Sequence, residues 1–133
     1  MRKTIAIAGL ALAAAGCTAE EPPEARMDRE AALAAELRDY EQTGPAVSCV
    51  STRDLEGNRS AGGAIIFEGH GRRIWVNRPA GGCPDLRNNA LKIRTTGTQF
   101  CRGDIVDVVD LANGIHYGGC GLGDFTPYER RRG

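Results

Sequence analysis

Three parts of the chain differ in how their hydrophobic residues are spaced. Residues 4–15 form a short apolar run behind Arg2 and Lys3. Within residues 27–42, large apolar side chains recur at helical spacing, whereas short apolar segments separated by glycine-rich turns follow from residue 46 onward. This pattern predicts a leader segment, one amphipathic helix and a domain built mainly of β-strands.

The segment 27–43 is predicted to be the amphipathic helix. Leu33, Leu37 and Tyr40 form one narrow apolar stripe, Asp28 can cap the helix start, and the Gly-Pro pair at 44–45 can end the helix. Because the stripe holds only three large apolar residues, it is expected to pack against the domain that follows. A helix that binds a partner is the alternative.

The remaining segment, residues 44–133, is predicted to be a β domain. The Gly-His-Gly sequence at 69–71 is expected to form a hairpin turn, and no helical pattern interrupts the strands. The predicted fold class is mainly β (α+β): a small antiparallel sheet or open barrel of about five strands with one N-terminal amphipathic helix, stapled by disulfides. The strands are expected at residues 46–52, 64–68, 72–77, 90–96 and 104–111.

The first 16 residues have the layout of a secretory signal peptide, with an apolar core too short to span a bilayer as a helix. The sequence Ala14-Ala15-Gly16-Cys17 resembles a bacterial lipobox, although Ala14 stands where leucine is usual. That resemblance implies that Cys17 receives a diacylglycerol and becomes the new N-terminus, and that Thr18 favours the outer membrane. Cleavage by the ordinary signal peptidase, leaving a soluble protein with a spare thiol, is the alternative.

Charge is distributed unevenly along the chain. Residues 18–43 carry three arginines and eight acidic residues, a net charge of −5, whereas residues 44–133 carry twelve basic and nine acidic residues, a net charge of +3. Residues 17–26, with two prolines and three glutamates, are expected to be a flexible tether behind the lipidated cysteine. The basic excess of the domain is too small to predict nucleic-acid binding.

The chain has five cysteines, and four of them lie in the β domain: Cys49, Cys83, Cys101 and Cys120. Structural zinc sites usually contain two ligand cysteines a few residues apart, and no such pair occurs here, so no metal is expected. An exported domain of 90 residues gains stability from disulfides, which persist in an oxidising compartment. Two disulfides are therefore predicted, and the spacing leaves all three pairings open.

Arginines gather at two places in the sequence of the β domain. Arginine suits phosphate and carboxylate recognition, and the anions at an outer membrane include lipopolysaccharide phosphates and peptidoglycan carboxylates. The alternative is ordinary solvated charge. The candidate anion- or partner-binding surface consists of Arg72, Arg73, Trp75, Arg78, Arg130, Arg131 and Arg132.

No catalytic set is evident in the sequence. His70 and His116 lie in or beside predicted turns, and no serine sits in a G-x-S-x-G nucleophile elbow. Asp104, Asp107 and Asp110 do not fit a Ca²⁺-binding loop and are expected to keep an edge strand soluble. An enzyme of the hydrolase type, using His70 or His116, is the third interpretation and has less support from the sequence than the two non-enzymatic ones.

Four motifs in the β domain carry a family resemblance: SCVSTR at 48–53, IWVNRP at 74–79, GTQFCR at 97–102 and LGDFTPY at 122–128. With these motifs the chain resembles a group of small uncharacterised envelope proteins of alphaproteobacteria, especially sphingomonads. The group implies no function. The resemblance does imply a pairing of Cys49 with Cys101, since these positions belong to its motifs, and hence of Cys83 with Cys120.

These observations predict a periplasm-facing lipoprotein, anchored in the outer membrane, with a non-enzymatic structural or binding role and no cofactor. Its expected partners are the membrane, reached through the N-terminal lipid, and an envelope protein or cell-wall glycan. The second interpretation is a soluble periplasmic binding or inhibitor module without lipid.

Overall fold

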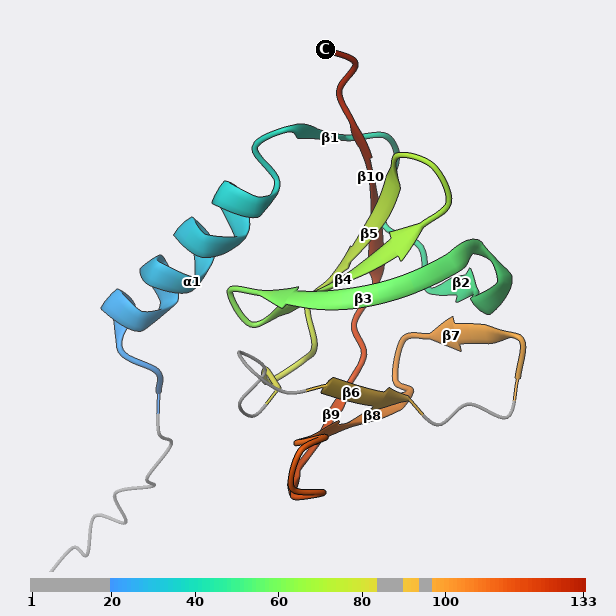
Figure 1. Cartoon of the computed structure of the whole chain (residues 1–133). Helices are drawn as coiled ribbons and strands as arrows, with labels where there is room; N and C mark the ends of the chain where they lie inside the picture. The colour runs from blue at the N-terminus through green and yellow to red at the C-terminus, as the bar shows by residue number, and fades with distance from the viewer. Residues whose placement is uncertain (1–19, 84–89, 94–96) are drawn as a thin grey trace, which may run out of the picture.

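The structure, a computed structural model, describes residues 20–83, 90–93 and 97–133. Three layers of secondary structure lie against one another (Figure 1). Helix α1 (Pro23–Glu36) covers one face of a five-stranded sheet, and the opposite face packs against a smaller three-stranded sheet. All strand pairs of the sheets are antiparallel, which confirms the mainly β fold with one N-terminal helix.

The five-stranded sheet forms the middle layer of the domain. The last strand of the chain lies inside it, between the first strand and the hairpin of residues 64–77. Its strands, in spatial order, are β1 (Tyr40–Gln42), β10 (Phe125–Arg130), β5 (Arg73–Asn77), β4 (Ala64–Gly69) and β3 (Leu55–Ala61).

Two smaller sheets complete the domain. The three-stranded sheet has the order β6 (Ala90–Ile93), β8 (Ile105–Val109) and β9 (His116–Gly121). A separate two-stranded sheet pairs β2 (Cys49–Ser51) with β7 (Gln99–Cys101). Neither sheet closes on the five-stranded one, so the domain is a stack of open sheets rather than a barrel.

Strands β4 and β5 are buried on both faces because each lies between two layers. Ile65 and Phe67 face the cluster shared with β8 and β9, whereas Ala64 and Ile66 face the cluster beneath α1. Side chains alternate between the two faces of a strand, so a strand covered on both sides needs consecutive apolar residues. The sequence AIIF at 64–67 meets that need, which explains why this strand was predictable.

The helix differs from its prediction at both ends. It begins at Pro23 rather than Met27, because proline is favourable in the first helical turn, and the expected cap Asp28 lies inside the helix. Residues 23–26 therefore belong to the helix and not to the tether. The helix ends at Glu36 because Tyr40 and the next two residues pair with β10 instead.

The apolar stripe of the predicted helix does pack on the domain. Leu33 is 2% exposed against Ile66, Ile74 and Val76, and the partly buried Leu37 and Tyr40 extend the same cluster. The stripe thus crosses the helix end and continues into the following turn and strand. This packing fixes the position of α1 on the sheet.

The turn between β3 and β4 lies directly beneath the helix. Gly62 and Gly63 form a two-residue turn with positive φ angles of 57° and 79°. A Cβ atom at position 62 would overlap the backbone carbonyl oxygen of Arg29 in α1. Glycine at this position therefore allows the helix backbone to approach the turn.

The described residues form ten strands, five of them in the largest sheet. β3 was missed because its sequence LEGNRSA consists mostly of polar or small residues, exposed or half-buried, and shows no run or alternation of apolar residues. β8 was predicted, but it is the central strand of its sheet, so the interpretation of its aspartates as edge-strand charges is wrong. Asp104 instead accepts a hydrogen bond from the backbone N–H of Cys101 at 2.8 Å.

The four domain cysteines form two disulfides. Cys49 and Cys101 are directly opposite one another on β2 and β7, and Cys83 is bonded to Cys120 of β9. These are the two pairs that the family resemblance implies. The first bridge ties the two-stranded sheet together, and the second attaches the segment after β5 to the three-stranded sheet.

Candidate functional site

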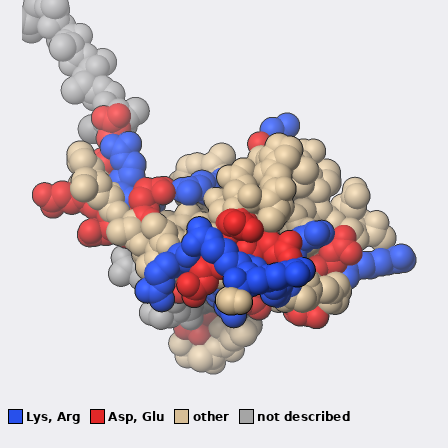
Figure 2. Space-filling model, turned by 90° about the horizontal axis from the view of Figure 1, so that it is seen from above, with Lys and Arg blue, Asp and Glu red and all other residues tan. Residues whose placement is uncertain are grey.

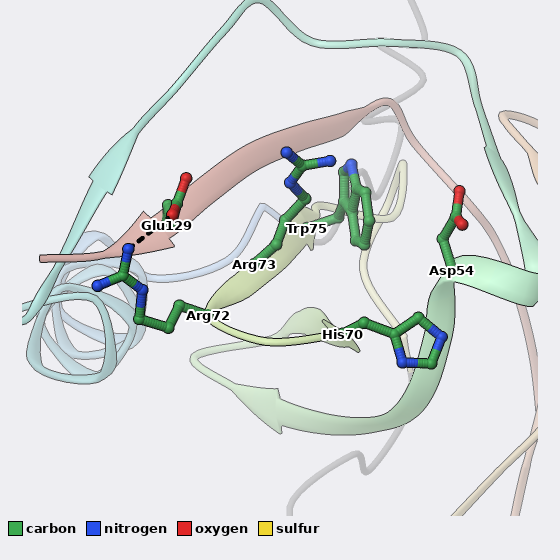
Figure 3. A pocket seen from close by; sticks show the side chains of 6 residues that line it. All are labelled: Asp54, His70, Arg72, Arg73, Trp75 and Glu129. Atoms are coloured by element: carbon green, nitrogen blue, oxygen red, sulfur yellow. Dashed lines mark hydrogen bonds and ion pairs between the residues drawn. The ribbon is translucent and has the colours of Figure 1, made fainter.

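A small hollow opens beside the β4–β5 turn, with a volume of about 170 Å³. Trp75 and Arg73 come from β5, Glu129 comes from β10, and the others come from the turn and from the short helix before β3. Figure 3 shows the side chains gathered around it. The lining residues are Asp54, His70, Arg72, Arg73, Trp75 and Glu129.

Trp75 forms the apolar base of the hollow. It is 8% exposed and belongs to the main core cluster. Its ring packs so closely on Gly69 that a Cβ atom there would lie 2.5 Å from Cζ3 of the tryptophan. The ring is therefore held rigidly, and only a small part of it faces solvent.

Arg73 lies over this tryptophan. Its Cζ atom is 5.9 Å from the centroid of the Trp75 ring, within the range of a cation–π contact. The residue is exposed, and it makes no ion pair or side-chain hydrogen bond with any residue that the structure describes. Arg73 thus has an ordered position and donors that a partner could use (Figure 3).

The neighbouring arginines already have partners. Arg72 Nη2 lies 3.1 Å from Glu129 Oε1, and Arg59 is paired with Glu68. Arg130 donates a 3.1 Å hydrogen bond to the Tyr40 hydroxyl. The acidic partners offset the charges of Arg72 and Arg59 locally. The partner of Arg130 is neutral, and its Cζ atom lies 5.2 Å from the centroid of the Tyr40 ring.

Seen from the end where the C-terminus lies, the surface carries both signs of charge (Figure 2). A band of basic side chains crosses this end, with acidic side chains between them. We call this surface the arginine face and define it by Arg59, Arg72, Arg73 and Arg130, which line the two adjoining hollows here. Glu68 and Glu129 are paired with arginines, so this surface offers a partner mainly the donors of the arginines without an acidic partner, Arg73 and Arg130.

The sequence-predicted surface is only partly brought together. Arg72, Arg73 and Arg130 lie with Trp75 on the arginine face.

The other three arginines lie elsewhere. Arg78 is 2.6 Å from Glu30 of helix α1, so it fixes the helix rather than joining the arginine face. Arg131 donates to the backbone carbonyl of Arg38 at 3.3 Å, and Arg132 is exposed beyond the end of β10.

Tyr40 and Glu129 are members of this site that the sequence did not reveal. Tyr40 was assigned to a helix, and its hydroxyl reaches Arg130 only because residues 40–42 pair with β10. Glu129 lies opposite Arg73 across the β10–β5 ladder. In the sequence, Glu129 stands directly before three arginines, but this local pattern does not specify which strand the segment pairs with.

His70 has a structural contact at each ring nitrogen. Nδ1 lies 2.7 Å from Glu56 Oε1, and Nε2 lies 2.9 Å from the backbone carbonyl oxygen of Arg53. The hydrogen bond to that carbonyl, and then the carboxylate of Glu56, raise the pKa of His70 above its usual value. Both neighbours are acceptors, so the doubly protonated ring fits best and has no lone pair for a general base.

The remaining residues singled out in the sequence lie outside the arginine face or outside the described part of the chain. Cys17 lies outside the described residues. His116 is exposed on β9, and no cluster of three metal-binding side chains occurs among residues 20–83, 90–93 and 97–133. Within the same residues, no helix has the length and apolar character needed to cross a bilayer.

Comparison of the chain with protein-family models, with curated proteins and with solved structures gives no match. The resemblance to small envelope proteins of alphaproteobacteria therefore stays a prediction.

Proposed function

We propose that the protein is an exported lipoprotein that is anchored through Cys17 and presents a non-enzymatic binding domain to the periplasm. The cysteine pairing is the observation that carries the anchoring part. Four of the five cysteines are used in two disulfides within the domain, so Cys17 is left as the odd cysteine, directly behind an apolar leader. An unpaired thiol is a liability in an oxidising compartment, and acylation removes it.

The arginine face supports the binding part of the proposal. Arg73 has no acidic partner among the described residues, it is ordered by Trp75, and it lies beside the ion pairs Arg72–Glu129 and Arg59–Glu68. Arginine and tryptophan are among the residues enriched at the energetic hot spots of protein interfaces. The candidate partners are an envelope protein or the cell-wall glycan with its peptide carboxylates.

The geometry gives less support to a hydrolase. His70 would have to accept a proton, but both of its ring nitrogens already face acceptor oxygens. His116 is exposed on the glycine-rich strand β9. The binding interpretation therefore accounts for more of the described contacts.

Anchoring is tested by the mass and the membrane association of the mature protein. We expect added acyl mass on Cys17 and retention in the detergent phase after a high-salt wash. Cys17→Ser should abolish both, whereas Ala14→Leu, which restores the usual lipobox residue, should preserve both. Recovery of a soluble wild-type protein with a free thiol at Cys17 would overturn the proposal.

The binding role is tested by photo-crosslinking in intact cells. A photoreactive residue in place of Arg73 should capture one dominant partner, and the same residue in place of Arg102 serves as the control, because Arg102 lies in the β7–β8 turn and pairs with Asp124 at 3.2 Å. Arg73→Ala should weaken the interaction with that partner, measured with purified proteins, more than Arg72→Ala does. Equal capture at both positions would argue against a binding role for the arginine face.

A further inference from the structure

The hairpin that joins β8 to β9 carries an exposed apolar tip. We define the hairpin tip as residues 110–117. Leu111 is 79% exposed, Ile115 is 49% exposed and Tyr117 is 39% exposed, whereas Val106 and Val108 of the same hairpin are fully buried in the core. The apolar side chains of the tip therefore extend beyond the packed part of the three-stranded sheet.

Hydrogen bonds within the turn give the hairpin tip a defined shape. The Asp110 carboxylate accepts hydrogen bonds from the backbone N–H groups of Ala112 and Asn113, at 2.8 and 3.2 Å, and from the Asn113 side chain at 2.8 Å. The Asp110 backbone N–H donates to the Ile115 carbonyl at 2.8 Å. Leu111 is thus presented by an ordered turn, which lowers the entropic cost of binding through it.

The position of the hairpin tip relates it to the proposed lipid anchor. In Figure 1 the tip lies at the bottom of the molecule, opposite the C-terminus, and residues 20–22, which precede α1, lie below the helix on that side. Cys17 is three residues before Glu20, where the description of the chain begins, so an extended chain places it within about 10 Å of that residue. A bilayer that holds Cys17 is therefore near this side of the domain.

We propose that the hairpin tip docks on the lipid surface as a second, non-covalent membrane contact. This inference rests on the proposed anchoring at Cys17. Leu111 and Ile115 would enter the boundary between headgroups and acyl chains, and Tyr117 would lie at headgroup level, where aromatic side chains with a polar end are favoured. A contact this small is weak alone, but a short tether raises its effective concentration.

The charge of the hairpin tip determines which lipids it can bind. Residues 110–117 contain Asp110 and His116 but no lysine or arginine. Their attraction to a bilayer is therefore apolar, and it should depend little on anionic lipid or on salt. Docking in this orientation also leaves the arginine face at the opposite end, turned away from the membrane and toward the periplasm (Figures 1 and 2).

Tryptophan fluorescence can test this docking on the full-length domain. The chain has a single tryptophan, Trp75, and it is buried in the core, so a second tryptophan is readily detected. We would place it at the tip in Leu111→Trp and, as the matched control, at the opposite end in Arg132→Trp. Each protein, residues 17–133, would be exported behind a signal peptide that is cleaved without lipidation, so that Cys17 keeps a free thiol. This thiol would be coupled to a maleimide-bearing phospholipid in phosphatidylcholine vesicles that contain a brominated quencher lipid.

We expect a blue shift and a loss of emission for the tryptophan at 111 and neither change for the tryptophan at 132. The difference should persist at high salt and should not increase when phosphatidylglycerol is added. Without coupling, Leu111→Ser should weaken partitioning into vesicles about tenfold relative to the unsubstituted protein, because one buried leucine is lost. Equal quenching at 111 and 132 would overturn the inference.

The design keeps this inference separate from the anchoring proposal. Chemical coupling supplies the tether whether or not cells acylate Cys17, so the quenching result decides the docking of the tip in either case. Absence of acyl mass on the cellular protein would refute the anchoring proposal alone. Quenching that appears only with phosphatidylglycerol and disappears in salt would refute apolar docking and indicate a different, electrostatic contact.

Discussion

Substitution of Gly62 tests how helix α1 is held on the sheet. A Cβ atom at this position would overlap the Arg29 carbonyl oxygen and would lie 3.1 Å from the backbone nitrogen of Leu33. Both are helix backbone atoms, so a side-chain rotation cannot relieve the overlap. Gly62→Ala must therefore push the helix away from the turn or distort the turn itself.

The expected loss of stability in Gly62→Ala has two contributions. Alanine in the left-handed region, at the φ of 57° found here, costs about 1–2 kcal/mol. Displacing the helix also exposes part of Leu33, which is 2% exposed, and full loss of such burial costs about 1.5–3 kcal/mol. We expect Gly62→Ala to lower the free energy of unfolding by about 2–4 kcal/mol, since the burial is lost only in part.

Gly71 provides a matched control for the backbone cost. It also lies in a turn with positive φ, 71°, but no atom lies within 4 Å of its would-be Cβ. Gly71→Ala should therefore show only the conformational cost. Denaturant unfolding followed by circular dichroism measures both variants under non-reducing conditions. If the two substitutions lower the free energy of unfolding equally, the close approach of α1 to the turn is not the cause.

Three further predictions concern the interior, the histidine and the second disulfide. Asn77 is fully buried and bonds both the N–H and the carbonyl of Gly123 at 2.8 Å, so Asn77→Ala should lower the free energy of unfolding by about 2–4 kcal/mol in denaturant titrations. If Asn77→Ala leaves the free energy of unfolding unchanged, the two hydrogen bonds to Gly123 are not formed. The raised pKa of His70 means that its contribution to stability is full below pH 6.5 and declines as pH rises through the folded-state pKa. The stability difference between the unsubstituted protein and His70→Gln should therefore be larger at pH 5.5 than at pH 8; a difference that grows with pH would contradict this sign. Replacing Cys83 and Cys120 together by serine should cost about 4 kcal/mol in the chain-entropy model, and peptide mapping of the unreduced protein should recover these two cysteines in one linked peptide.

The sequence pattern predicted a strand correctly where apolar residues follow one another along it. Consecutive apolar residues identified β4 and β5, because a strand covered on both faces cannot include polar side chains without partners. The polar strand β3 and the glycine-rich strand β9 have no such pattern. Their pairing partners, β4 and β8, determine their conformation, and this information is not local.

The candidate site was predictable only in part, for a related reason. Arg72 and Arg73 are neighbours of Trp75 in sequence, so their association with it could be expected. Arg130 and Tyr40 reach the same face through the pairing of β10 with β1 and β5. Arg78, although close in sequence, lies beyond Asn77 and is directed to Glu30 of α1. Proximity in sequence was therefore an unreliable guide once a strand ended.

The interior position of β10 has a consequence for the timing of folding. This strand comes last in the chain, yet it is the only partner of β1 in the sheet and one of the two partners of β5. Residues 40–42 therefore have no sheet to join until residues 125–130 are available. If the proposed export takes place with the chain unfolded, residues 40–42 cannot join the sheet before β10 has emerged. In that case the order of the strands would delay closure of the sheet until residues 125–130 have crossed the membrane.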